Sequence, residues 1–130
     1  MNESTPQRPE GERIVDAALV SIDLPKFMEQ IKTEPAWLNG PRNAITVFKS
    51  ERLRIVLIAL RTGTEMPTHT ADGMISVQVL EGSLHFGTDA EKVQLTQGQL
   101  VTLHERIPHS VLALEESTFL LTLAPSPKPK

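Results

Sequence analysis

The feature that most limits the fold is a regular alternation of short apolar runs and turn-forming pairs, which begins near residue 41 and continues to residue 124. The runs are rich in valine, isoleucine, leucine and threonine, and pairs such as Glu81-Gly82 and Gln97-Gly98 separate them. Short strands at turn-marked intervals are typical of an antiparallel sandwich or barrel. The expected strands are residues 44–49, 53–61, 75–80, 83–86, 93–96, 99–103, 110–114 and 117–123.

One short stretch ahead of these strands has helical spacing instead. Asp23 is suited to cap its N-terminus, Pro25 fits its first turn, and Pro35 is expected to end it. We expect this amphipathic helix to pack on the outside of a sheet or on a partner subunit. Its apolar positions are Leu24, Phe27, Met28 and Ile31.

Two of the expected strands, 53–61 and 117–123, are apolar on both faces over much of their length. A strand with one face in water would alternate, so something must cover the outer face. The N-terminal helix or a second copy of the chain could do so, and we expect a homodimer.

Trp37 is interpreted as a hydrophobic anchor for the N-terminal segment, and Arg61 as a solvated residue at an exposed strand end.

Composition limits both the architecture and the partners. A chain of 130 residues that is 39% hydrophobic suits one domain, divided here into an arm and short helix (1–40), a barrel (41–124) and a flexible Pro/Lys tail (125–130). The net charge of −3 and the lack of a basic run argue against nucleic-acid and membrane binding. The N-terminus has no apolar signal segment, so a cytoplasmic protein is expected. Because there is no cysteine, histidine and carboxylate must carry any metal chemistry.

Two histidines carry the chemical signal. His69 lies in a Pro-Thr turn ahead of the strand 75–80, and His109 follows Pro108 where a loop enters the strand 110–114. Each therefore enters or leaves a short strand. The two side chains could face one another across a small barrel.

These stretches resemble the paired motifs of the cupin superfamily, which are small β-barrels of the jelly-roll type. Gly63, His69 and Gly82 fit the first motif, and Gly98 and His109 fit the second. The resemblance covers roughly residues 44–124. It implies an all-β fold, namely a cupin-like jelly-roll barrel (double-stranded β-helix) with a short N-terminal helix, and dimers that pair through a sheet.

The resemblance also implies a metal site, of which this chain keeps only a part. In the family, two histidines and a glutamate of the first motif join the histidine of the second motif in holding a divalent metal. Ala71 and Ile75 stand at the second histidine and glutamate positions, so His69 and His109 remain. A divalent metal (Fe, Mn, Ni, Cu or Zn) would need other donors, since zinc and its neighbours usually require three protein ligands. In the second motif, the proline, glycine and asparagine positions hold His104, Arg106 and Ala113.

Three interpretations of His69 and His109 stay open. They are ligands of a reduced metal site, polar contacts for a ligand in the barrel, or hydrogen-bonded histidines that line its mouth. Ile75 and Val77 are expected to line the barrel interior as further ligand-binding residues. His104 either adds an imidazole at the pocket rim or faces water.

Two hypotheses for function follow. In the first, the barrel holds a small organic ligand in an apolar pocket, and the loss of the glutamate and one histidine favours this. In the second, the protein is a metal-dependent cupin enzyme of dioxygenase or isomerase type, with its two-histidine ligand set completed by water or substrate. The sequence does not name a substrate for either.

Overall fold

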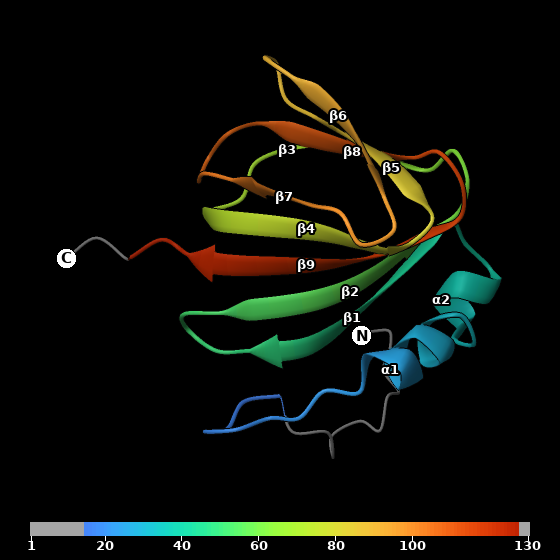
Figure 1. Ribbon diagram of the computed structural model, residues 1–130. Helices are drawn as coiled ribbons and strands as arrows, with labels where there is room; N and C mark the ends of the chain where they lie inside the picture. Colours follow the sequence, from blue (N-terminus) through green and yellow to red (C-terminus); the bar gives the residue numbers. More distant parts are fainter. Residues whose placement is uncertain (1–14, 128–130) are drawn as a thin grey trace.

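A computed structural model describes residues 15–127 as two antiparallel β-sheets that face each other (Figure 1). One sheet has the strand order β1-β2-β9-β4-β7, and the other has the order β3-β8-β5-β6. Strands distant in sequence become neighbours because the chain crosses between the sheets, and the all-β jelly-roll prediction is confirmed. The strands are β1 (Arg42–Lys49), β2 (Arg54–Leu60), β3 (Glu65–His69), β4 (Gly73–Glu81), β5 (Ser83–Gly87), β6 (Lys92–Thr96), β7 (Leu100–Leu103), β8 (His109–Ala113) and β9 (Ser117–Pro125).

The expected strands all form, and one further strand, β3, was not predicted. The Pro-Thr turn expected at His69 is wrong, because His69 is the last residue of β3. Most side chains of β3 are exposed, and its pairing with β8 is irregular between Met66 and His69. An exposed edge strand interrupted by Pro67 has no apolar alternation by which a sequence could reveal it.

The main hydrophobic core lies between the two sheets. In β4, Ile75, Val77 and Val79 are buried and alternate with the half-buried Ser76 and Gln78, as a strand with one inward face requires. The other buried members of this core come from both sheets. They are Ile58, Leu60, Leu84, Phe86, Leu95, Val111, Ala113 and Phe119.

The N-terminal segment forms an outer layer on the larger sheet. The helices α1 (Leu24–Ile31) and α2 (Pro35–Leu38) lie beside β1 and β2 (Figure 1). Asp23 caps α1 as predicted, and its carboxylate accepts a hydrogen bond from the Lys26 N–H at 3.2 Å. Pro35 does not end α1, which stops four residues earlier. Instead it opens α2, where the missing N–H of proline is no loss.

A second apolar cluster fills the space between this layer and the sheet. It contains the buried side chains of Ile31, Leu57 and Ala59 together with Trp37, which is 4% exposed. Trp37 is therefore confirmed as a hydrophobic anchor of the N-terminal segment. The chain itself covers the outer face of β2, so the apolar character of that face is explained without a second copy.

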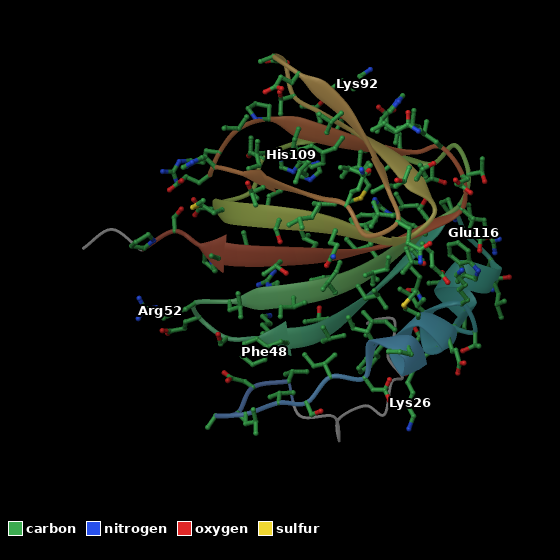
Figure 2. All side chains as sticks on the ribbon, viewed as in Figure 1. Lys26, Phe48, Arg52, Lys92, His109 and Glu116 are labelled. Atoms are coloured by element: carbon green, nitrogen blue, oxygen red, sulfur yellow. The ribbon has the colours of Figure 1, made fainter. Side chains whose placement is uncertain are left out.

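Charged side chains gather at the periphery of this arrangement. In Figure 2, Lys26, Arg52 and Lys92 lie at the outside of the molecule, whereas His109 lies between the sheets.

Across residues 15–127, neither helix has the length and apolar character needed to span a bilayer.

Candidate functional site

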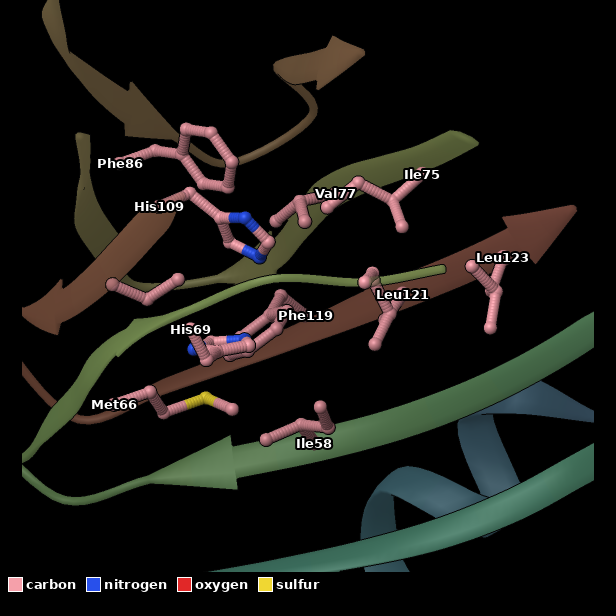
Figure 3. A pocket seen from close by; sticks show the side chains of 12 residues that line it. Ile58, Met66, His69, Ile75, Val77, Phe86, His109, Phe119, Leu121 and Leu123 are labelled. Carbon is pink, nitrogen blue, oxygen red and sulfur yellow. The ribbon is translucent and has the colours of Figure 1, made fainter. Parts of the chain in front are cut away.

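A cavity of about 150 Å³ lies between the two sheets (Figure 3). Ten apolar side chains and two histidines line it. The structure brings His69, His109, Ile75 and Val77 together here, as the motif register predicts. The remaining lining residues are Ile58, Met66, Ala71, Phe86, Val111, Phe119, Leu121 and Leu123.

The two histidines come from neighbouring strands and lie against each other. His69 of β3 is paired with His109 of β8 across the ladder, and their ring centroids are 4.4 Å apart at an interplanar angle of 59°. The His109 ring also stacks on Phe86, with centroids 5.5 Å apart. His109 is only 4% exposed, whereas His69 is exposed, so His69 marks the solvent side of the pair.

Backbone carbonyl groups fix the proton positions on both rings. Nδ1 of His69 lies 2.7 Å from the Pro67 carbonyl oxygen, and Nδ1 of His109 lies 2.9 Å from the Ile107 carbonyl oxygen. A carbonyl oxygen can only accept, so each Nδ1 carries the proton and donates it. Nε2 of each neutral ring is left with a free lone pair.

Burial favours the neutral form of His109. Desolvation lowers the pKa of His109, and the nearby His69 lowers it further, while the hydrogen bond to the Ile107 carbonyl opposes the shift. A neutral imidazole suits a cavity lined with Phe86 and aliphatic side chains, because a charge there would lack solvation.

The two lost donor positions of the first motif face this same cavity. Ala71 and Ile75 line it beside His69 and His109. Among residues 15–127, His, Asp and Glu side chains nowhere form a group of three or more that could hold a metal ion. Two imidazoles are fewer than the three protein ligands of a usual zinc-type site, so this donor set does not fit the family's metal site.

His104 is not a lining residue. Its side chain is 79% exposed and lies 3.9 Å from the Glu105 carboxylate. Of the two places expected for His104 it therefore has the one in solvent, and its inclusion among the ligand-binding residues is corrected. Arg106 pairs with Asp72 at 2.7 Å, and both side chains are exposed. Arg106 also has a φ of 60°, a left-handed conformation at the position where the second cupin motif has glycine.

Several lining residues were missed by the sequence reasoning. Met66 could not be assigned because β3 itself was not predicted. Phe86 lies in the correctly predicted strand β5. Phe119, Leu121 and Leu123 lie in β9, whose sequence is apolar on both faces, so alternation does not identify its inward face. The missing information was the strand order, which decides which inward side chains share a cavity.

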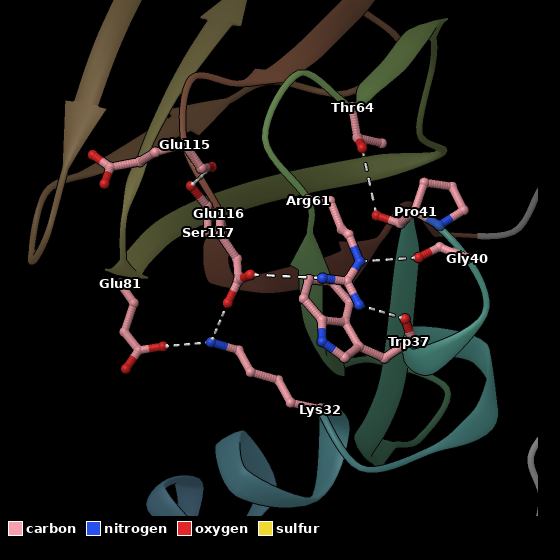
Figure 4. Close-up of polar contacts among 10 residues, drawn as sticks. All are labelled: Lys32, Trp37, Gly40, Pro41, Arg61, Thr64, Glu81, Glu115, Glu116 and Ser117. Carbon is pink, nitrogen blue, oxygen red and sulfur yellow. Dashed lines mark hydrogen bonds and ion pairs between the residues drawn. The ribbon is translucent and has the colours of Figure 1, made fainter.

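Arg61 lies outside the cavity lining, and its side chain is 43% exposed, but it also makes contacts that the sequence did not predict. Its guanidinium lies 4.1 Å from the centroid of the Trp37 ring and donates to the Trp37 carbonyl at 2.8 Å (Figure 4). It also donates to the Gly40 carbonyl at 3.3 Å and lies 3.9 Å from the Glu116 carboxylate. Arg61 therefore holds the end of the N-terminal segment against the barrel.

Sequence comparisons with families and curated proteins give no match. No protein-family model fits the sequence, and no curated protein is significantly similar to it. Solved structures do match the barrel. An RmlC-like cupin protein from Desulfovibrio desulfuricans is 28% identical, with a TM-score of 0.60 over 65% of this chain and 83% of its own. The chain has the fold of the cupin superfamily.

Two further solved structures also match this chain. A conserved protein of unknown function from Streptococcus pyogenes is 25% identical, with a TM-score of 0.63 over 67% of this chain and 76% of its own. A salicylate 1,2-dioxygenase from Pseudaminobacter salicylatoxidans is 23% identical, with a TM-score of 0.66 over 76% of this chain and 33% of that enzyme chain. The cupin fold alone therefore assigns no activity to this chain.

Proposed function

We propose that this cupin barrel binds a small organic molecule, with His69 and His109 as its polar contacts. The observation that carries the proposal is the composition of the cavity: ten apolar side chains surround two imidazoles with free Nε2 lone pairs. A largely apolar pocket with a few convergent polar groups is the usual form of a small-molecule site. A volume of about 150 Å³ restricts the ligand to one ring or a short chain.

The test is thermal stabilisation of the full chain by a panel of small organic molecules. A ligand at about 100 times its Kd should stabilise the folded protein by about 2.7 kcal/mol, which raises Tm by several degrees. Ala71→Phe should abolish the stabilisation by filling the cavity. Leu38→Phe, on a 63% exposed residue of α2, is the matched control and should keep it. Failure of every compound to raise Tm would refute the proposal.

A metal-dependent enzyme is the second candidate, and the orientation of the two rings favours it. Metal-binding histidines usually donate the other ring N–H to a carbonyl or carboxylate, as His69 and His109 do. The test is elemental analysis of protein purified without a chelator, beside a His69→Ala/His109→Ala double variant. A stoichiometric metal that disappears in the variant would support an enzyme, whereas no metal in either protein would remove this candidate.

We also propose that two copies of the chain pair through the outer face of the larger sheet, in the part that α1 and α2 do not cover. Met74 and Leu100 are 43% and 53% exposed there, on β4 and β7. Light scattering should give twice the mass of one chain, and Leu100→Glu should halve it. A monomer at all concentrations would rule out the pairing.

A further inference from the structure

The hydrogen-bonding capacity of the cavity limits which ligands it accepts. The polar side chains in its lining are His69 and His109, and each has already committed its Nδ1–H to a carbonyl oxygen, of Pro67 and Ile107 respectively. The lining side chains therefore offer two acceptors and no donor. A ligand that only accepts hydrogen bonds, such as an ether or ketone, finds no side-chain partner.

The lining also disfavours a charged ligand. It contains no lysine or arginine, and the more buried imidazole, His109, is enclosed by Phe86 and aliphatic side chains. A carboxylate in this space would lose its hydration without gaining a cation. The ligand should therefore enter uncharged.

The size and walls of the cavity indicate a single aromatic ring. An engineered apolar cavity of about 150 Å³ in another protein takes up benzene, and the cavity here has about that volume. Phe86 and Phe119 supply aromatic walls, and His109 stacks nearly parallel to Phe86 at 15°. A planar ring can pack on these faces by stacked or edge-to-face contacts.

We propose that the ligand is a neutral single-ring aromatic molecule that donates a hydrogen bond to Nε2 of His69 or His109, which is the chemistry of a phenol. This inference rests on the proposed ligand-binding function and deepens it by naming the ligand class. It excludes aromatic carboxylates such as benzoate as the preferred ligand.

The test compares phenol, anisole, toluene and benzoate by calorimetry on the full chain at about pH 8, where histidine is neutral. Anisole carries a methyl group in place of the phenol proton, and toluene lacks the oxygen. We expect phenol to bind at least about tenfold more tightly than anisole or toluene. Benzoate should bind more weakly than all three.

Variants assign the preference to the two imidazoles. His69→Leu and His109→Leu should each bring the affinities for phenol and toluene closer together. His104→Leu, a change on the surface, should leave the preference as in the natural chain. Equal affinity for phenol, anisole and toluene would overturn the inference and leave the ligand-binding function intact. Absence of binding by all four compounds would also overturn the inference, and the ligand-binding function would fall with it only if the wider panel raised no Tm either.

A second measurement does not depend on how the variants fold. Nitrogen-15 NMR of the natural chain should find both histidines protonated at Nδ1, with the Nε2 resonances shifting when phenol is added. A proton on Nε2 of both rings would overturn the inference, because the cavity would then present donors.

Discussion

The hydroxyl of Thr118 is a buried group with an unmet hydrogen-bonding need. Within the described part of the chain, its Oγ1 is the buried side-chain polar atom that has no partner, and the residue is completely inaccessible. An unsatisfied buried hydroxyl destabilises the folded state by about 1 kcal/mol or more. Thr118→Val should therefore raise the free energy of unfolding by about 1 kcal/mol in a urea titration.

The neighbouring Ser117 provides the control with the opposite sign. It is equally buried, but its hydroxyl lies within 3.0 Å of the Ser83 backbone N–H and carbonyl oxygen. Ser117→Ala should lower the free energy of unfolding by about 1 kcal/mol. If both variants lose stability, the Thr118 hydroxyl has a partner after all.

The lowered pKa of His109 predicts a pH dependence of stability. Well above about pH 6.5 the ring is neutral in the folded and unfolded chains, so its titration does not change the free energy of unfolding there. As the pH falls below that value, the unfolded chain binds the proton first, and the free energy of unfolding decreases. Between about pH 7.5 and about pH 5.5, the urea midpoint should fall less in His109→Phe than in the natural chain. His104→Phe, on an exposed histidine, should keep the full decrease, and identical decreases in all three proteins would contradict the assignment.

How far a strand can be predicted depends on whether one of its faces is buried. β4 has buried residues at every second position, and the sequence predicts both its place and its inward residues Ile75 and Val77. β3 lies at a sheet edge with mostly exposed side chains, and the sequence misses it together with Met66. Side chains from β2, β3, β4, β5, β8 and β9 line the cavity, and the periodicity of a single strand does not show which strands become neighbours.

The first motif still presents the lost donor positions to the cavity, so its metal site should be recoverable. Ala71→His with Ile75→Glu adds an imidazole and a carboxylate beside His69 and His109. Four donors should bind one zinc ion per chain, and zinc should raise Tm of this variant more than Tm of the natural chain. The apo variant should be less stable, because an unpaired carboxylate is costly in an apolar space.

The matched control keeps the imidazole at position 71 and moves the carboxylate to the exposed face of β4. In Ala71→His with Met74→Glu, the carboxylate lies on the exposed residue that precedes Ile75. This variant should bind zinc weakly, by mass spectrometry and by the Tm shift. Equal zinc binding by both double variants would show that the barrel does not bring positions 71 and 75 to one site.

The attachment of the N-terminal segment to the barrel combines ion pairs with one buried aromatic ring. Lys32 pairs with Glu116 at 3.0 Å and Glu81 at 3.3 Å (Figure 4), but these side chains are 32%, 45% and 50% exposed. Exposed ion pairs contribute about 0–1 kcal/mol, whereas truncation of a buried tryptophan costs about 3–5 kcal/mol. Trp37→Ala should therefore reduce the free energy of unfolding far more than Lys32→Met, measured by urea titration. Similar losses would mean that the ion pairs hold the segment.

The strand order of the two sheets has a consequence for behaviour at high concentration. The edge strands are β1, β7, β3 and β6, and an edge strand can pair with another molecule. β1 and β6 carry arginine or lysine and β3 contains Pro67, but β7 (Leu100–Leu103) has neither a charge nor a proline. Self-association by strand addition should therefore start at β7, and Thr102→Lys should slow the growth of turbidity on heating. Because β7 is short, it offers few backbone groups for pairing, and this limits amyloid-like assembly.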